Sequence, residues 1–133
     1  MTFNWKDYLV FAENINAAPD TPGPNEAALR SVASRAYYAA FRAAVEFGKI
    51  SGFSPSRLGE DHELIRKHFR ELRPASKAAM NISTQLDRLH DYRKKADYDN
   101  TLGQKPENIA YYAIGMAKKV FQCIDELSRT KAP

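Results

Sequence analysis

The 133-residue chain has the length of one domain with its own hydrophobic core, and its single cysteine, Cys123, excludes an intramolecular disulfide and any metal site built on several cysteines. The start of the chain has no apolar signal segment, and no stretch approaches the ~18 apolar residues of a membrane span, so we expect a soluble, cytoplasmic protein. The net charge of +4 favours an anionic partner only weakly, because basic and acidic side chains are interleaved along most of the chain.

Apolar residues recur at helical spacing in segments that short breaks separate. The first predicted helix covers residues 5–16 and ends before a proline-rich segment at residues 19–24, which cannot continue a helix. The second helix, residues 25–47, has the clearest pattern, and the alanines on its apolar stripe indicate close approach of a neighbouring helix. A shorter third helix begins at Asp61, the expected N-cap, and runs through Leu72.

Pro74 either starts or kinks the fourth predicted helix, which ends near Ala96, and the last helix starts at Pro106. No segment alternates with a period of two over enough residues to form a strand. The sequence therefore predicts an all-α fold in which residues 1–133 form one domain, an antiparallel bundle of four main helices plus a short helix.

The end of the fourth helix departs from its apolar pattern. Steps of three and four residues carry the apolar stripe from Ala75 through Leu89 to Ala96, and Arg93 lies on this stripe. A buried guanidinium keeps its charge and needs an anionic partner or ligand, and Asp97, four residues on, is within reach. The alternative is that the helix has reached a solvated end, with Tyr92 continuing the stripe.

Other polar side chains are candidates for binding. Arg35 lies on the polar face of the second helix and either contacts a phosphate or forms a structural salt bridge, while Tyr38 would line a cleft beside it. His62 is either a proton carrier or phosphate ligand, or a first-turn histidine bonded to a carboxylate. We expect Tyr37 in the core and His90 in solvent, and the histidine spacing matches no zinc site, so no metal is expected.

Basic side chains concentrate at residues 66–73 and 88–95, the second segment including Lys94 and Lys95. These two segments together would make a positive groove for an RNA backbone. The alternative is a solvated helix face on which Glu63 and Glu71 are intrahelical partners.

Three features of the sequence carry a family resemblance: the run SRAYYAAF at residues 34–41, His62, and the run RKKADYD at residues 93–99. This combination resembles the HEPN superfamily (higher-eukaryote and prokaryote nucleotide-binding domain), and its small prokaryotic stand-alone members in particular, over nearly the whole chain. The resemblance implies a helical bundle that forms a homodimer with a composite cleft. Many HEPN proteins are metal-independent endoribonucleases that act as toxins or defence effectors, paired with a nucleotidyltransferase or another antitoxin.

The nuclease site of such proteins is an arginine followed shortly by a histidine. Arg93 matches the arginine, but Tyr98 stands where the histidine would be, and a tyrosine with a pKa of about 10 is a poor general base. The resemblance implies catalytic candidates Arg93, Asp97 and Tyr98, substrate-binding candidates Arg35, Tyr38, His62, Lys94 and Lys95, and no cofactor. Two hypotheses follow: an RNA-cleaving toxin or defence effector, and a non-catalytic module that binds RNA, a nucleotide or a protein partner.

Overall fold

The computed structural model describes residues 3–17 and 25–130, and regular structure in these residues is entirely helical. The helices are α1 (Lys6–Ala17), α2 (Asn25–Ile50), α3 (Asp61–Glu71), α4 (Lys77–Tyr98) and α5 (Pro106–Thr130). The predicted all-α fold is confirmed, and the predicted proline-rich break lies outside the described residues.

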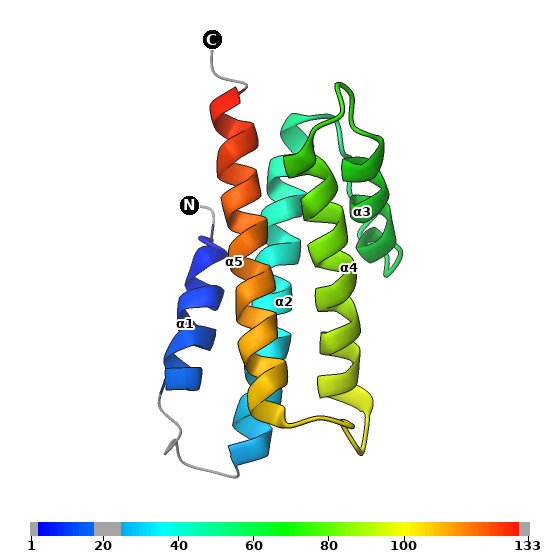
Figure 1. Ribbon diagram of the computed structural model, residues 1–133. Coiled ribbons are helices and arrows are strands. Elements are labelled where there is room, and N and C mark those ends of the chain that lie inside the picture. Colours follow the sequence, from blue (N-terminus) through cyan, green and yellow to red (C-terminus); the bar gives the residue numbers. More distant parts are fainter. Residues whose placement is uncertain (1–2, 18–24, 131–133) are drawn as a thin grey trace.

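Three long helices, α2, α4 and α5, lie side by side and form the body of the bundle (Figure 1). Helix α1 packs on α2 and α5, whereas α3 packs on α4 and α2 at the opposite side. Helices α2 and α5 run in one direction and α1 and α4 in the other, so helices that follow one another in this frame are antiparallel (Figure 1). This topology brings α2, α3 and α4 together at one place.

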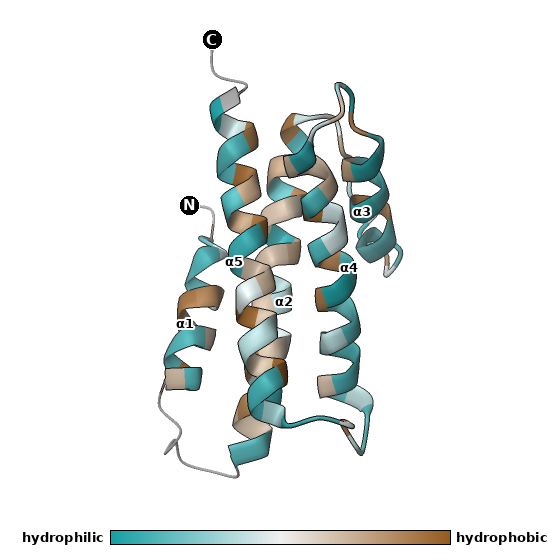
Figure 2. Ribbon diagram, viewed as in Figure 1, coloured by the Kyte–Doolittle hydropathy of each residue, from teal (hydrophilic) through white to brown (hydrophobic). Residues whose placement is uncertain are grey.

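The core is built from the apolar stripes of these helices, which appear as brown bands between the teal outer faces (Figure 2). The alanine stripe of α2 is buried as predicted: Ala33, Ala36, Ala40 and Ala44 have no exposed surface. At Gly48 an added Cβ would lie 3.0 Å from Cδ1 of Ile65, so the missing side chain lets α3 pack closely on α2. No helix in the described part of the chain is both long and apolar enough to cross a membrane.

Two helix boundaries differ from the prediction. Helix α2 continues to Ile50 and is followed by Gly52, whose φ of 100° suits a glycine after a helix. Helix α4 begins at Lys77 and not near Pro74, because Ser76 is its N-cap and the Ser76 hydroxyl accepts a hydrogen bond from the Ala79 N–H at 3.1 Å.

The predicted N-cap role of Asp61 is wrong. The N-cap of α3 is Glu60, which makes no side-chain cap hydrogen bond, and Asp61 is the first helical residue. The buried Asp61 carboxylate instead accepts hydrogen bonds from the Ser56 N–H at 2.9 Å, the Ser56 hydroxyl at 2.7 Å and the Arg57 N–H at 2.9 Å. Burial alone would raise the pKa of Asp61, but these hydrogen bonds outweigh burial and hold the pKa below its ordinary value.

Asp61→Ala is expected to lower the free energy of unfolding by about 1–3 kcal/mol, because the donors of Ser56 and Arg57 lose their acceptor. The loop also relies on this carboxylate to hold Arg57 at a φ of 64°, a conformation that costs about 1–2 kcal/mol for a residue with a side chain. Urea denaturation measures the change. Glu60→Ala is the matched control and is expected to stay within about 0.5 kcal/mol of the wild type; an equal loss in both variants would contradict the assignment.

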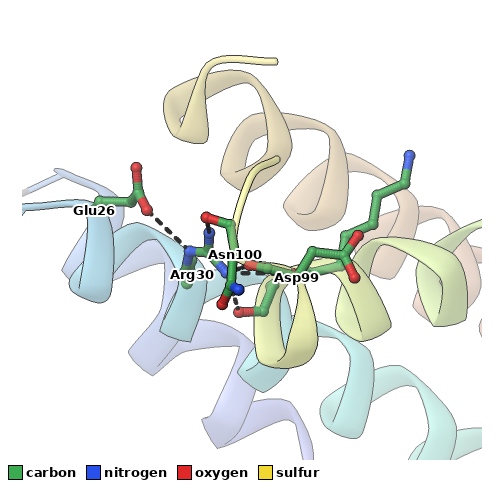
Figure 3. A network of polar contacts seen from close by, with 6 residues as sticks. Glu26, Arg30, Asp99 and Asn100 are labelled. Atoms are coloured by element: carbon green, nitrogen blue, oxygen red, sulfur yellow. Dashed lines mark hydrogen bonds and ion pairs between the residues drawn. The ribbon is translucent and has the colours of Figure 1, made fainter. Parts of the chain in front are cut away.

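The C-terminal end of α4 is held by a side chain from α2, which the sequence analysis did not anticipate (Figure 3). Nη1 of Arg30 donates to the carbonyl oxygens of Ala96 at 3.0 Å and Asp99 at 2.6 Å, and Nη2 donates to that of Asn100 at 3.5 Å. Glu26 orients the guanidinium through a 3.1 Å ion pair with Nε. Arg30 thereby satisfies carbonyl groups that a helix end leaves unpaired, and it fixes the last turn of α4 against α2.

Candidate functional site

Arg93 lies on the buried face of α4, where the apolar stripe predicted it. The neighbouring stripe positions Leu89 and Ala96 are buried, and Arg93 itself is only 8% exposed. Tyr92 packs partly against the core beside it but does not replace Arg93 on this face. The solvated-end alternative is therefore wrong, and the structure must accommodate a buried guanidinium.

Aromatic rings surround the Arg93 guanidinium. Its Cζ atom lies 5.5 Å from the ring centre of Tyr37, 5.4 Å from that of Tyr38 and 5.9 Å from that of Tyr98. Nη1 forms an ion pair with Oδ2 of Asp97 at 3.6 Å, and this carboxylate is exposed. Nε of Arg93 is buried and has no hydrogen-bond partner among the described residues. The rings contribute cation–π attraction, but one N–H remains unsatisfied.

Two histidines lie beside the ring of Tyr37. The hydroxyl of Tyr37, from α2, is hydrogen-bonded to Nδ1 of His62, from α3. The His62 ring also stacks on Phe41, with ring centres 4.3 Å apart. The ring centre of His90, from α4, lies 5.4 Å from those of both Tyr37 and His62. The place where α2, α3 and α4 meet therefore holds a phenol and two imidazoles in contact.

A second arginine reaches the same place from α3. Nε of Arg66 lies 3.7 Å from Oδ1 of the exposed Asp87, while its Nη1 is buried and has no hydrogen-bond partner among the described residues. We call Tyr37, His62, Arg66, His90 and Arg93 the arginine–histidine cluster. Buried N–H groups are rarely left unpaired, and each costs about 1–3 kcal/mol. A third such group among the described residues, Nε of Arg42, lies outside the cluster, but two at one place on cationic side chains suit an anion ligand.

The cluster shifts the acid–base behaviour of its own members. Burial lowers the pKa of His90 to about 4, helped by the positive charges of Arg66, Lys94 and Arg93. Burial and the same two arginines lower the pKa of His62, against the opposing effect of Asp61. Burial raises the pKa of Tyr37. Both imidazoles are consequently neutral and the phenol is protonated at neutral pH.

The contact between Tyr37 and His62 selects one tautomer of the imidazole. A phenol is a stronger acid than a neutral imidazole, so the Tyr37 hydroxyl donates and Nδ1 of His62 accepts. The hydrogen of His62 therefore lies on Nε2, where it is available to donate to an anion. His90 makes ring contacts to the same pair and supplies a second neutral imidazole.

Folding stability is expected to fall when the pH is lowered from 6.5 to 4. The unfolded His90 side chain titrates near its ordinary value of 6.5, whereas the folded one titrates at about 4, so the unfolded chain binds more protons between these values. The His90 contribution is complete above this window and declines as pH falls through it, and His62 shifts in the same direction.

Urea midpoints measured at pH 7 and pH 4.5 check this expectation. The loss of stability between the two pH values should be smaller in His90→Gln than in the wild type. Asp61, whose pKa is also lowered on folding, does not affect the comparison, because both proteins contain it. An equal pH dependence in both proteins would contradict the placement of His90.

The structure brings together only some of the side chains that the sequence singled out. Arg93, Asp97 and Tyr98 lie together at the end of α4, with Tyr38 and His62 beside them; the ring centres of the last two are 6.3 Å apart. Tyr98 is 73% exposed, at the surface above Arg93.

The other three candidates make different contacts. Arg35 is exposed and sits over the rings of Tyr8 and Phe11 on the α1 side of α2, whereas α1 makes no contact with α4. Among residues 3–17 and 25–130, Arg35 makes these ring contacts and not the salt bridge considered for it. Lys94 and Lys95 are exposed on α4, where Lys94 pairs with Asp91 at 3.8 Å and Lys95 lies over the ring of Tyr92.

Most of the arginine–histidine cluster was not predicted from the sequence. The expectation that His90 is solvated is wrong, because it is partly buried among aromatic rings. Tyr37 is in the core as expected, and its hydroxyl is also hydrogen-bonded to Nδ1 of His62. Helical spacing could have predicted two of these pairs. His90 precedes Arg93 by one turn, and Arg66 follows His62 by one turn, so each pair shares a helix face.

No cluster of three or more histidine, cysteine, aspartate or glutamate side chains in residues 3–17 and 25–130 is arranged to hold a metal ion. No protein-family model, curated protein or solved structure matches the chain. The geometry and charge of the arginine–histidine cluster are therefore the structural basis for inferring a function.

Proposed function

We propose that this protein binds RNA at the arginine–histidine cluster and cleaves it without a metal ion. The observation that carries the proposal is the pair of unsatisfied buried N–H groups on Arg66 and Arg93, next to two neutral histidines. A phosphodiester supplies the acceptor oxygens that these donors lack. A neutral imidazole next to a bound phosphate is suited to take up a proton at physiological pH.

The proposed reaction uses the 2′-hydroxyl of RNA as the attacking group. A neutral imidazole removes the proton of the 2′-hydroxyl, and the 2′-oxygen then bonds to the adjacent phosphorus. The bond from phosphorus to the 5′-oxygen breaks, and this oxygen leaves with a proton from a donor of the cluster. The products are a 2′,3′-cyclic phosphate and a 5′-hydroxyl. Arg93 and Arg66 stabilise the charge that develops on the phosphate oxygens.

Phosphate binding would also raise the pKa values of His62 and His90. In the free protein, burial and the positive charges of Arg66 and Arg93 hold the pKa values of His62 and His90 below the ordinary value. A nearby anion favours the protonated form of an imidazole, so bound phosphate raises these pKa values toward neutrality. One histidine as base and the other as proton donor then become compatible with neutral pH.

The resemblance to HEPN nucleases supports the same class of activity, and we include the family assignment in the proposal. The cluster differs from the motif of that family in one respect: its histidines come from α3 and from the turn before Arg93, not from the residues after it. Homodimer formation, a role as a toxin or defence effector, and a nucleotidyltransferase or other antitoxin partner belong to the proposal on the strength of the resemblance alone.

The second candidate function is a non-catalytic module that binds RNA, a nucleotide or a protein partner. One observation favours it: Arg93 already has the Asp97 carboxylate and three aromatic rings as neighbours, which would give the guanidinium a structural role. In this case the charge of Arg93 would serve folding or binding and not a reaction.

An RNA-cleavage assay with purified protein in excess chelator separates the two functions. The proposal expects cleavage, with fragments that carry 2′,3′-cyclic phosphate and 5′-hydroxyl ends. It also expects no cleavage of RNA that is 2′-O-methylated throughout, since the attacking hydroxyl is then blocked. Binding without cleavage of unmodified RNA would favour the non-catalytic module, and cleavage of the methylated RNA would rule out the chemistry described above.

A further inference from the structure

We propose that the face formed by α4 and α5 is a binding track for single-stranded RNA that leads to the arginine–histidine cluster. This inference rests on the proposed function and specifies its substrate class. Helices α4 and α5 lie side by side along the bundle (Figure 1), and the hollows described below lie along them.

Three adjoining hollows form this track. The first, of about 430 Å³, is lined by Tyr98 and Lys95; the second, of about 440 Å³, shares Lys95 with it and also contains Tyr112. The third, of about 510 Å³, shares Tyr112 with the second and extends to Lys118. Because the Tyr98 ring lies 5.9 Å from Cζ of Arg93, the track begins beside the candidate site.

Aromatic rings are available along the track for base stacking. Tyr92 and Tyr112 have nearly parallel rings with centres 6.5 Å apart, and Tyr111 meets Tyr112 edge-on at 5.6 Å. Tyr111 is 70% exposed and Tyr112 is 48% exposed, so both rings present surface to a ligand. Exposed tyrosines in a row are the platform on which unpaired bases stack, whatever their sequence.

The charge of the track fits a phosphate backbone. Its lining contains five basic side chains and two acidic ones, the basic ones being Arg88, Lys94, Lys95, Lys118 and Lys119. Two of the basic side chains form ion pairs. Lys94 pairs with Asp91 of the lining at 3.8 Å, and Lys118 pairs with Glu13 of α1, outside the lining, at 3.3 Å. The excess of positive charge beside aromatic rings favours a polyanion with exposed bases over an apolar protein surface.

The track should discriminate between single-stranded and duplex RNA. Stacking requires base faces that a duplex keeps inside its own helix, so a duplex can use only the basic side chains of the track. Single-stranded RNA can use the rings and the charges together. We therefore expect tighter binding of a single strand than of a duplex of the same sequence.

Fluorescence anisotropy with a labelled 2′-O-methylated single-stranded RNA tests the track, because this probe cannot react through a 2′-hydroxyl. The dissociation constant is expected to rise at least about 25-fold in the Tyr111→Ala/Tyr112→Ala double variant, since each stacked base contributes about fivefold or more. The Tyr111→Phe/Tyr112→Phe variant keeps the rings and should bind within about twofold of the wild type. Phe11→Ala removes a half-exposed ring on α1 and is the matched control, expected to bind like the wild type.

Unchanged binding by the double alanine variant, or equal affinity for single strand and duplex, would overturn the track. Circular dichroism confirms that each variant is folded, and light scattering shows whether the variants change oligomeric state. Weaker binding that accompanies dissociation of a dimer would assign this face to an interface between two copies and would also overturn the inference.

The test remains separate from the proposed function. Tyrosine-dependent binding without any cleavage of unmodified RNA would leave the track standing and reject the nuclease. Cleavage of unmodified RNA that does not respond to the tyrosine substitutions would reject the track and leave the nuclease standing.

Discussion

Arg93→Met is expected to lower the rate of RNA cleavage by about 10²–10³-fold, the loss typical of removing one preorganised donor to a developing anion. The substitution should leave the protein folded, with a melting temperature equal to or above that of the wild type. Methionine has similar length, fills the space between Tyr37 and Tyr38, and makes favourable contacts with aromatic rings. It also removes a buried N–H that has no partner.

The exposure of Asp97 makes this substitution a clean test. Breaking a buried ion pair costs about 3–5 kcal/mol when the remaining charge is buried, but the Asp97 carboxylate is exposed and stays hydrated. Single-turnover cleavage and thermal unfolding are measured on the same preparations, with Arg93→Lys as the variant that keeps the charge. A folded Arg93→Met protein that cleaves as fast as the wild type would remove Arg93 from the mechanism, whereas an unfolded one would assign the arginine to structure.

His62→Gln and His90→Gln are each expected to slow cleavage by about 10²–10⁴-fold, the contribution of a positioned proton-transfer group. Glutamine keeps a polar side chain of similar reach in each position but cannot exchange a proton at neutral pH. The double variant should be little slower than the slower single variant, because two groups that act in one step are not additive. Rates from single-turnover assays in chelator give all three values.

His68→Gln is the matched control for the histidine variants. His68 lies on α3 with His62, but its Nε2 is hydrogen-bonded to the Ser51 hydroxyl at 2.8 Å and its ring packs against Phe53, away from the cluster. We expect this variant to cleave within about twofold of the wild type. Cleavage retained in both His62→Gln and His90→Gln would contradict the proposed chemistry, and the non-catalytic module would then be favoured.

Helical periodicity predicted the all-α fold and offered a buried Arg93 as one of two alternatives, because both depend on spacing within one helix. The apolar stripe of α4 placed Arg93 on a buried face, and Arg93 is buried there. The boundary near Pro74 was wrong for a local reason, since the Ser76 side chain caps the helix two residues later than the proline.

The rest of the cluster depends on how three helices pack, which spacing within a single helix cannot reveal. His62 and Tyr37 are 25 residues apart in the sequence, and their hydrogen bond exists only because α3 packs on α2. His90 seemed solvated because Asp91 and other charged residues surround it in the sequence, yet its own face of α4 points at Tyr37. For Arg35 the sequence could not show that the side chain packs over the rings of Tyr8 and Phe11 on α1.

The burial of Arg93 also bears on how such a sequence persists through evolution. Methionine or leucine at this position would satisfy the core at least as well, and random substitution offers such changes repeatedly. If the proposed activity were not required, such a replacement would cost only the Asp97 ion pair and the ring contacts of the guanidinium. Packing alone does not call for an arginine at this buried position, which is what the proposed function would explain.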